Sequence, residues 1–212
     1  MTTIITIDDH PLFRKGLAQL LEMGTELELV GEAASGREGI QLAEELKPEL
    51  ILLDLNMAEM NGIETLQHLK QADVDAYIVM MTVSDHEEDL VAAIRSGADG
   101  YLLKDMEPED TLVAINKVIN GEMAISNRLT SLLAHALKVE NTIPDNASQA
   151  GLTERELEIV KLIAQGRSNK LIARELNIVE STVKVHVKHA LKKLKLKSRV
   201  EIAVWATNNL ND

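Results

Sequence analysis

The sequence contains no cysteine and few aromatic residues. Without cysteine the chain can form neither disulfide bonds nor thiolate metal sites, which agrees with a reducing cytoplasm. Only 2% of its 212 residues are aromatic, so its cores must rest on Leu, Ile, Val, Ala and Met. No apolar run approaches the roughly 18 residues of a membrane span, and the start, MTTIITIDDH, is acidic where a signal peptide would be apolar. We therefore expect a cytoplasmic protein that is not bound to a membrane.

Basic residues are scarce in the first part of the chain. Residues 1–125 contain 8 Lys and Arg against 25 Asp and Glu, a net charge of −17, whereas residues 126–212 contain 14 against 9, a net of +5. Seven basic residues and one acid occur between Glu180 and Arg199. An acidic half joined to a half with a basic patch suggests two tasks, the second of them near a polyanion.

Apolar runs rich in β-branched residues alternate with helical patterns through the first half of the chain. Near-continuous apolar stretches such as LILLDL indicate strands buried on both faces, as in a parallel sheet covered by helices. We therefore predict an α/β domain of flavodoxin-like, doubly wound topology with a five-stranded parallel sheet. The expected strands are Thr3–Ile7, Leu27–Ala33, Leu50–Leu53, Ala76–Met81 and Gly100–Leu103.

Acidic, hydroxyl and basic side chains occur where these strands run out. Asp8 and Asp9 follow the first strand directly, whereas Asp54, Thr82 and Lys104 come at the ends of the third, fourth and fifth. Because the carboxyl ends of parallel strands open onto one crevice, these five side chains should lie together. Carboxylate oxygens suit Mg²⁺, which often bridges to phosphate, and the Asp54 carboxylate can act as a nucleophile that accepts a phosphoryl group.

Two functions of other classes compete with this interpretation. A phosphatase with an aspartate nucleophile would need a second acid two residues after Asp54, where this chain has Asn56, so we expect the protein not to be an enzyme. The domain could instead serve only for docking or dimerisation, independently of phosphorylation. His10, His68 and His135 have no convincing metal or catalytic spacing, and we interpret them as surface or packing residues.

The first half resembles the receiver domain of response regulators. The likeness rests on the acidic pair in IDDH, on LILLDLNM around Asp54, on Thr82, and on GYLLKD, which contains Tyr101 and Lys104. The resemblance implies that Asp54 is the phosphoacceptor and that a sensor histidine kinase supplies the phosphate. It further implies that Thr82, Lys104 and the rotating aromatic Tyr101 form the switch.

The same resemblance implies a bound Mg²⁺. Its ligands would be Asp9, Asp54 and the backbone carbonyl of Asn56, with Asp8 acting through water. Two departures from the family pattern are visible. Ala58 and Asp105 stand where many receivers have proline, and we expect the first to loosen a loop and the second to leave no cis peptide, neither touching the chemistry.

The second half has the pattern of a small all-α domain. The stretch ENTIPDNASQAG reads as a flexible tether, and a short apolar helical pattern precedes it at Leu129, Leu132, Leu133, Ala136 and Leu137. Beyond the tether, Thr153 and Glu156 form a capping box, and three helices are expected before a final fourth one. We predict a receiver domain at 1–122, a linker helix and tether at 123–149, and a four-helix helix-turn-helix domain at 150–212.

Helical spacing assigns the faces of the third helix of this domain, which is expected from about Glu180 to Leu194. Its core stripe is Val183, His186, Val187, Ala190, Leu191 and Leu194, and its outer face carries Lys184, Val185, Lys188 and Lys192. An outward valine among lysines can touch a thymine methyl in a major groove, although it can equally be a tolerated surface residue. Val179 stands at the N-cap position of this helix, where its side chain cannot accept an amide hydrogen bond.

The segment from LTERELEIV to EIAVWA resembles the LuxR-type helix-turn-helix of the NarL/FixJ family. The resemblance implies base contacts from Lys184, Val185 and Lys188, and dimer contacts from the final helix, at Val200, Ile202, Ala203 and Trp205. Residues implied to lie nearer the DNA backbone are Ser181, Thr182, Lys192, Lys193 and Ser198. Both halves together imply a two-component response regulator, in which phosphorylation releases or dimerises the helix-turn-helix domain. It would bind double-stranded promoter DNA as a homodimer, in response to nitrate or nitrite.

Overall fold

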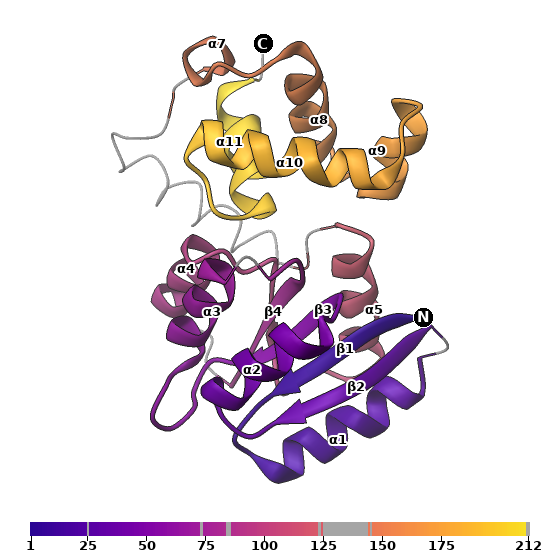
Figure 1. Cartoon of the computed structure of the whole chain (residues 1–212), viewed down its shortest axis with the longest axis vertical. Helices are drawn as coiled ribbons and strands as arrows, with labels where there is room; N and C mark the ends of the chain where they lie inside the picture. The colour runs from indigo at the N-terminus through magenta and orange to yellow at the C-terminus, as the bar shows by residue number, and fades with distance from the viewer. Residues whose placement is uncertain are drawn as a thin grey trace. The chain divides into compact units, whose positions relative to one another are not determined.

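The computed structural model describes residues 1–210 except 25, 73, 84–85, 123, 125–143 and 145. The chain divides into two compact units, Met1–Ile119 and Asn120–Asp212 (Figure 1). The helical pattern expected around Leu129–Leu137 lies outside the described residues. In the part of the chain that the structure describes, no helix combines the length and apolar character needed to cross a membrane.

The first unit contains a five-stranded parallel sheet in the order β2-β1-β3-β4-β5. Its strands are β1 (Thr2–Ile7), β2 (Leu27–Ala33), β3 (Leu50–Asp54), β4 (Tyr77–Thr82) and β5 (Gly100–Leu103). This arrangement confirms the flavodoxin-like fold predicted for the first half. The sequence-based limits are corrected only slightly, because β3 and β4 continue through Asp54 and Thr82 instead of ending one residue before them.

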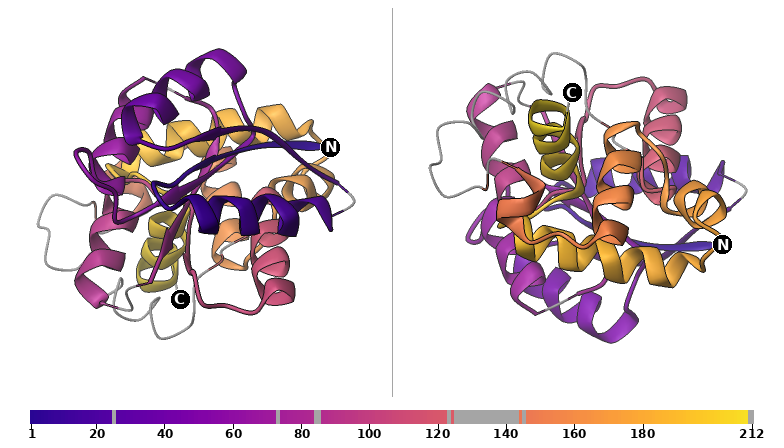
Figure 2. Two further views of the ribbon diagram at one scale, coloured as in Figure 1. Left: turned by 90° about the horizontal axis from the view of Figure 1, so that it is seen from below. Right: turned by 90° about the horizontal axis from the view of Figure 1, so that it is seen from above.

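Five helices cover the two faces of this sheet. They are α1 (Pro11–Glu22), α2 (Gly36–Leu46), α3 (Gly62–Gln71), α4 (Glu87–Arg95) and α5 (Pro108–Ile119). Helix α1 packs beside α5, while α3 packs between α2 and α4, and α1 and α2 lie on opposite sides of β1 and β2 (Figure 2). Every residue of β3 is therefore buried, which explains the unbroken apolar run of its first four residues.

The second unit is built from helices. They are the short α7 (Ala147–Ala150) followed by α8 (Glu154–Ala164), α9 (Asn169–Glu175), α10 (Glu180–Leu194) and α11 (Arg199–Asn209). The capping box of Thr153 and Glu156 opens α8 as predicted, and the Ser168 hydroxyl accepts the Leu171 amide at the start of α9. The four longer helices share one apolar core, to which α10 contributes Val183, Ala190 and Leu194.

Helix α10 begins without a side-chain cap. Val179 occupies the N-cap position in an extended conformation (φ −81°, ψ 151°), and its side chain, two-thirds exposed, accepts no amide hydrogen bond. Threonine fits the same backbone conformation and supplies an acceptor. Val179→Thr is therefore expected to raise the free energy of unfolding of the second unit by about 0.5–2 kcal/mol.

Urea unfolding followed by tryptophan fluorescence would measure this change, because Trp205 is the single tryptophan of the chain. Val185→Thr is a matched control, since Val185 is also an exposed valine but lies inside α10, where no cap is missing. A gain for Val179→Thr no larger than that for Val185→Thr would contradict the capping explanation.

Candidate functional site: an acidic cluster and a basic helix face

The carboxyl edge of the sheet brings the predicted strand-end residues together. Asp8 and Asp9 follow β1, Asp54 and Thr82 are the last residues of β3 and β4, and Lys104 follows β5. Parallel pairing sets β1 beside β3, β3 beside β4 and β4 beside β5. The Lys104 amide continues the ladder by donating to the Thr82 carbonyl at 2.7 Å. Sheet topology alone thus converts positions distant in the sequence into neighbours.

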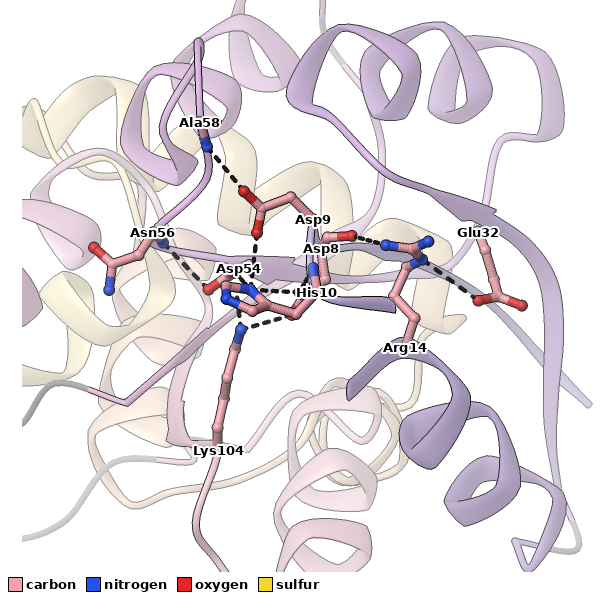
Figure 3. A network of polar contacts seen from close by, with 9 residues as sticks. All are labelled: Asp8, Asp9, His10, Arg14, Glu32, Asp54, Asn56, Ala58 and Lys104. Carbon is pink, nitrogen blue, oxygen red and sulfur yellow. Dashed lines mark hydrogen bonds and ion pairs between the residues drawn. The ribbon is translucent and has the colours of Figure 1, made fainter. Parts of the chain in front are cut away.

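One ammonium serves two buried carboxylates at the centre of this cluster (Figure 3). Lys104 Nζ lies 2.7 Å from Asp8 Oδ2 and 2.9 Å from Asp54 Oδ2, and all three side chains are at least nine-tenths buried. The Lys104 ammonium also lies 4.6 Å from the centroid of the Phe13 ring, with which it makes a cation–π contact. Lys104 is thereby held between an aromatic ring and two acids.

Burial raises the pKa of Asp54 above its ordinary value of 3.8. The hydrogen bond from Lys104 lowers this pKa, the negative charge of Asp8 raises it, and the Asn56 amide, 3.2 Å from Asp54 Oδ1, lowers it. The net effect is upward, because a buried carboxylate loses more hydration than its neighbours return. Asp54 is thus an acid whose charged form is costly until a further cation arrives.

Asp9 connects the cluster to two neighbouring groups. Its Oδ1 lies 2.8 Å from His10 Nδ1, and its Oδ2 accepts a hydrogen bond from the Ala58 amide at 3.0 Å (Figure 3). Sequence reasoning placed His10 on the surface, and its side chain is indeed two-thirds exposed, but it also faces the acids. The position at which this chain departs from the family pattern, Ala58, thus lies next to the cluster, because its backbone N–H contacts one of the acids.

The cluster has the donor set of a divalent-cation site. One ligand atom from each of Asp8, Asp9, His10 and Asp54 falls within 4.8 Å of the others. The buried oxygens Asp8 Oδ2 and Asp54 Oδ2 lie beside the Lys104 ammonium, and the buried Asp9 Oδ1 lies beside the His10 imidazole. Three carboxylates lie close together here, two of them sharing one lysine, so a hard cation with oxygen preference fits the residues present.

The predicted switch residues lie inside the unit. Thr82 is fully buried and Tyr101 is 6% exposed. Asn56 is exposed, and its side chain points away from the carboxylates (Figure 3), while its amide contacts Asp54. Among the described residues no peptide bond is cis, so the bond before Asp105 is trans, as its sequence indicated.

The outer face of α10 is basic, as the helical spacing predicted. Lys184, Val185, Lys188 and Lys192 are exposed, whereas Val183 is fully buried. Ser181 is also exposed and Thr182 is partly so. This face offers three ammonium groups and one apolar side chain, a set that suits phosphates and base edges in a major groove.

Two residues expected near the DNA backbone have partners within the second unit. Ser198 is 1% exposed and caps α11, its hydroxyl accepting the Glu201 amide. Lys193 Nζ lies 2.6 Å from Glu156 Oε2. Burial alone would raise the pKa of Glu156, but hydrogen bonds from Lys193 and Thr153 lower it below its ordinary value of 4.5. Ser198 and Lys193 thus also have structural roles within the second unit.

The apolar residues of α11 also have partners within the unit. Ile202, Ala203 and Trp205 belong to the core that α11 shares with α8, and Val200 is fully buried. The Trp205 indole donates to the Pro144 carbonyl at 2.7 Å. Ile202, Ala203 and Trp205 therefore help to fill the core of the second unit.

Comparison with known proteins agrees with this division of the chain. Residues 4–116 match the response regulator receiver domain, and residues 150–206 match the luxR family of bacterial regulatory proteins. The chain is 57% identical over 203 residues to the nitrate/nitrite response regulator protein NarL of Escherichia coli K12, covering 96% of this chain and 94% of that protein. It is 45% identical to NarP of the same strain over 201 residues, with 95% and 92% covered.

A solved structure of a response regulator matches along nearly the whole chain. The response regulator ChrA of a heme-sensing two-component system superposes with a TM-score of 0.52 and 28% identity, covering 97% of this chain and 96% of that chain. Family matches over both halves, together with identity along nearly the whole length, settle the family. The chain belongs to the two-component response regulators that join a receiver domain to a DNA-binding domain of the luxR family.

Proposed function

We propose that this response regulator is a transcription factor switched by phosphorylation of Asp54 and that it acts in nitrate- or nitrite-responsive gene regulation. The observation that carries the switch is the buried Asp54 carboxylate, paired with Lys104 beside Asp8 and Asp9, in the same chain as the exposed basic face of α10. The signal is proposed from the 57% identity to Escherichia coli NarL. Under this proposal the protein is a regulator and not an enzyme.

The cluster would accept a phosphoryl group from a sensor histidine kinase. Mg²⁺ would be held by Asp9, Asp54 and the Asn56 carbonyl, with Asp8 acting through water, and it would neutralise charge on the transferring group. The Asp54 carboxylate attacks phosphorus and displaces the kinase imidazole, while Lys104 pairs with a phosphoryl oxygen. The Thr82 hydroxyl binds another oxygen, and Tyr101 repacks with it.

Phosphorylation adds about −1.5 to −2 charge to a site that is already acidic. The rearrangement of Thr82, Lys104 and Tyr101 would shift an equilibrium between a closed form, in which the receiver masks the basic helix α10, and an open form, in which α10 is free. The freed domains would then bind promoter DNA as a homodimer on a two-fold site. Lys184, Val185 and Lys188 would contact bases. The residues nearer the DNA backbone would be Ser181, Thr182, Lys192, Lys193 and Ser198.

The domain limits 1–122, 123–149 and 150–212 remain part of this proposal. The two family matches leave residues 117–149 unmatched, which supports a connecting segment between the domains. Limited proteolysis would test the limits, because a tether should be cut before either folded domain.

The switch predicts that acetyl phosphate with Mg²⁺ raises DNA affinity by about tenfold, within the usual range for coupled sites. A DNA fragment selected from a random pool with the phosphorylated protein would serve as probe in fluorescence anisotropy. Asp54→Asn keeps the size of the side chain but removes the nucleophile, so it should bind this fragment with unchanged, low affinity in either condition.

The opposite result would favour the alternative function. If acetyl phosphate left the DNA affinity of the wild-type chain unchanged, and Asp54→Asn bound DNA as the wild type does, the receiver would serve only as a docking or dimerisation module. Mass spectrometry of the treated wild-type chain would first establish that Asp54 had been phosphorylated.

A further inference from the structure

The loop after β3 reaches across to the acidic pair after β1. The Ala58 amide donates to Asp9 Oδ2 at 3.0 Å, so a backbone group 49 residues away in sequence holds one of the expected cation ligands. Asp9 is the most exposed acid of the cluster, its side chain being 28% exposed against 3% for Asp8 and 2% for Asp54. Of the three carboxylates, it therefore has the most freedom to turn away from the site.

Three backbone hydrogen bonds fix the direction of the Ala58 amide. Leu55 N–H donates to Met81 O at 2.9 Å, Gly62 N–H donates to Leu55 O at 2.9 Å, and Met60 N–H donates to Ala58 O at 2.8 Å. Glu59 completes the turn in the left-handed region, with φ 64°. The donor is therefore part of a closed loop anchored to β4, and not of a freely moving segment.

The bond to Asp9 uses only one of its two oxygens. Oδ2 is taken by Ala58, whereas Oδ1 is buried and faces the cluster beside His10 (Figure 3). A carboxylate held by its outer oxygen presents its inner oxygen to an incoming cation. Groups that orient a metal ligand in this way typically contribute a factor of 10–100 to metal affinity.

We propose that the Ala58 amide is a positioning group that presets Asp9 for Mg²⁺ in this receiver. The inference rests on the proposed Mg²⁺ site and adds to it a contact that depends on residue 58 having an N–H. The Ala58 side chain plays no part, so any residue except proline can supply the donor. Orientation of Asp9 before the cation arrives removes part of the ordering cost of binding.

Calorimetric titration of the full-length chain with MgCl₂ tests this inference. Ala58→Pro removes the donor and is expected to weaken Mg²⁺ binding about tenfold. Ala58→Gly keeps the N–H and should bind Mg²⁺ within about twofold of wild type, although it makes the loop more flexible. Equal affinity in all three proteins, tighter binding by Ala58→Pro, or weakening by Ala58→Gly as large as that by Ala58→Pro would overturn the proposal.

A measurement on the wild-type chain covers the case in which Ala58→Pro distorts the loop. In amide NMR spectra, the Ala58 N–H should exchange slowly with solvent in the absence of cation and remain protected when MgCl₂ is added. Fast exchange before the addition, or loss of protection after it, would show that the bond is absent or competes with the cation. If the wild-type chain bound no Mg²⁺ at all, the proposed cation site would fail, and not merely the role of Ala58.

Discussion

Gly62→Ala is expected to destabilise the receiver by about 3 kcal/mol or more, because the added methyl group has no space. A Cβ at this position would lie 2.2 Å from the Asp54 carbonyl oxygen, 2.7 Å from Leu55 Cα and 2.9 Å from Met80 Cε. The first two atoms are backbone, so no rotamer change relieves the overlap. Relief requires moving the end of β3, and with it the Asp54 carboxylate.

Gly62→Ala should also slow phosphorylation of the receiver, because the strain that lowers its stability lies next to Asp54. Gly62 is the first residue of α3, whose N-cap Asn61 forms a capping box with Glu64, so this end of the helix cannot easily shift. Phosphorylation of Gly62→Ala by acetyl phosphate should therefore be slower than that of the wild type, even at a temperature where the variant is folded. Normal phosphorylation in a destabilised variant would mean that the strain is relieved away from Asp54.

Urea unfolding can follow the receiver separately from the second unit. Both tyrosines of the chain, Tyr77 and Tyr101, lie in the receiver, and the single tryptophan lies in the second unit. Gly16→Ala is the matched control, because Gly16 is exposed in the middle of α1 and a Cβ there would meet nothing within 4 Å. Alanine at that position should stabilise the receiver by about 0.5–1 kcal/mol.

The site residues could be predicted from the sequence because the topology of the sheet largely determines where they lie. Once apolar runs identify the strands, the residues that follow them in a parallel sheet share one edge, whatever the details of packing. Asp54 and Thr82 were assigned to strand ends, and both are the last residues of their strands. The position of Lys104 follows from strand pairing alone, since the ladder of hydrogen bonds between β4 and β5 continues to Lys104 and sets it beside Thr82.

Contacts made by backbone groups could not be predicted in the same way. The hydrogen bond from Ala58 to Asp9 depends on the path of a loop with one left-handed residue, and an alanine gives no sign of it. His10 had one available signal, its position directly after two acids. A residue that follows a strand-end pair enters the same crevice, so this adjacency indicates a place at the cluster even without a metal-binding spacing.

Helical periodicity predicts the face of a residue but not its partner. It placed Lys184 and Lys188 outside and Val183 inside, as observed. It could not show that Lys193 would pair with Glu156 across two helices, 37 residues apart in sequence. An apolar helix such as α11 likewise has the same pattern whether it fills its own core or a dimer interface.

Lys104→Met is expected to destabilise the receiver by about 3–5 kcal/mol at neutral pH without divalent cations. Methionine keeps an unbranched stem beside the Phe13 ring but removes the ammonium that pairs with Asp8 and Asp54. Two buried carboxylates would then face each other across the space that the ammonium had filled. Asp54→Asn should have the opposite effect on stability and stabilise the receiver, because it removes one of the two like charges.

The pH dependence follows from the raised pKa of Asp54. Since the folded chain holds the Asp54 proton more tightly than the unfolded chain, ionisation of Asp54 costs stability. This cost is absent below the ordinary pKa of 3.8, grows as the pH rises through the folded pKa, and is constant above it. The stabilisation by Asp54→Asn should therefore be largest at neutral pH and shrink as the solution is acidified.

Loss of Lys104 removes the two interactions with this residue that lower the pKa of Asp54. In Lys104→Met, the loss of stability caused by ionisation of Asp54 should accordingly begin at about the same pH as in the wild type. It should continue to a higher pH, because the folded pKa of Asp54 is higher in this variant. Urea midpoints of the tyrosine-monitored transition between pH 4 and 8, with EDTA present, would measure both variants against the wild type. Because the many surface acids are the same in all three proteins, their contribution cancels in the difference in stability between a variant and the wild type.

Charge compensation also predicts how Mg²⁺ should change the stability of these variants. If the destabilisation of Lys104→Met arises from uncompensated carboxylates, adding Mg²⁺ in place of EDTA should recover much of it, because the cation supplies two positive charges to the same oxygens. Asp54→Asn should gain less from Mg²⁺ than the wild type, since it has one acid fewer. A loss of stability in Lys104→Met that changed with neither pH nor Mg²⁺ would instead assign the role of Lys104 to its packing on Phe13.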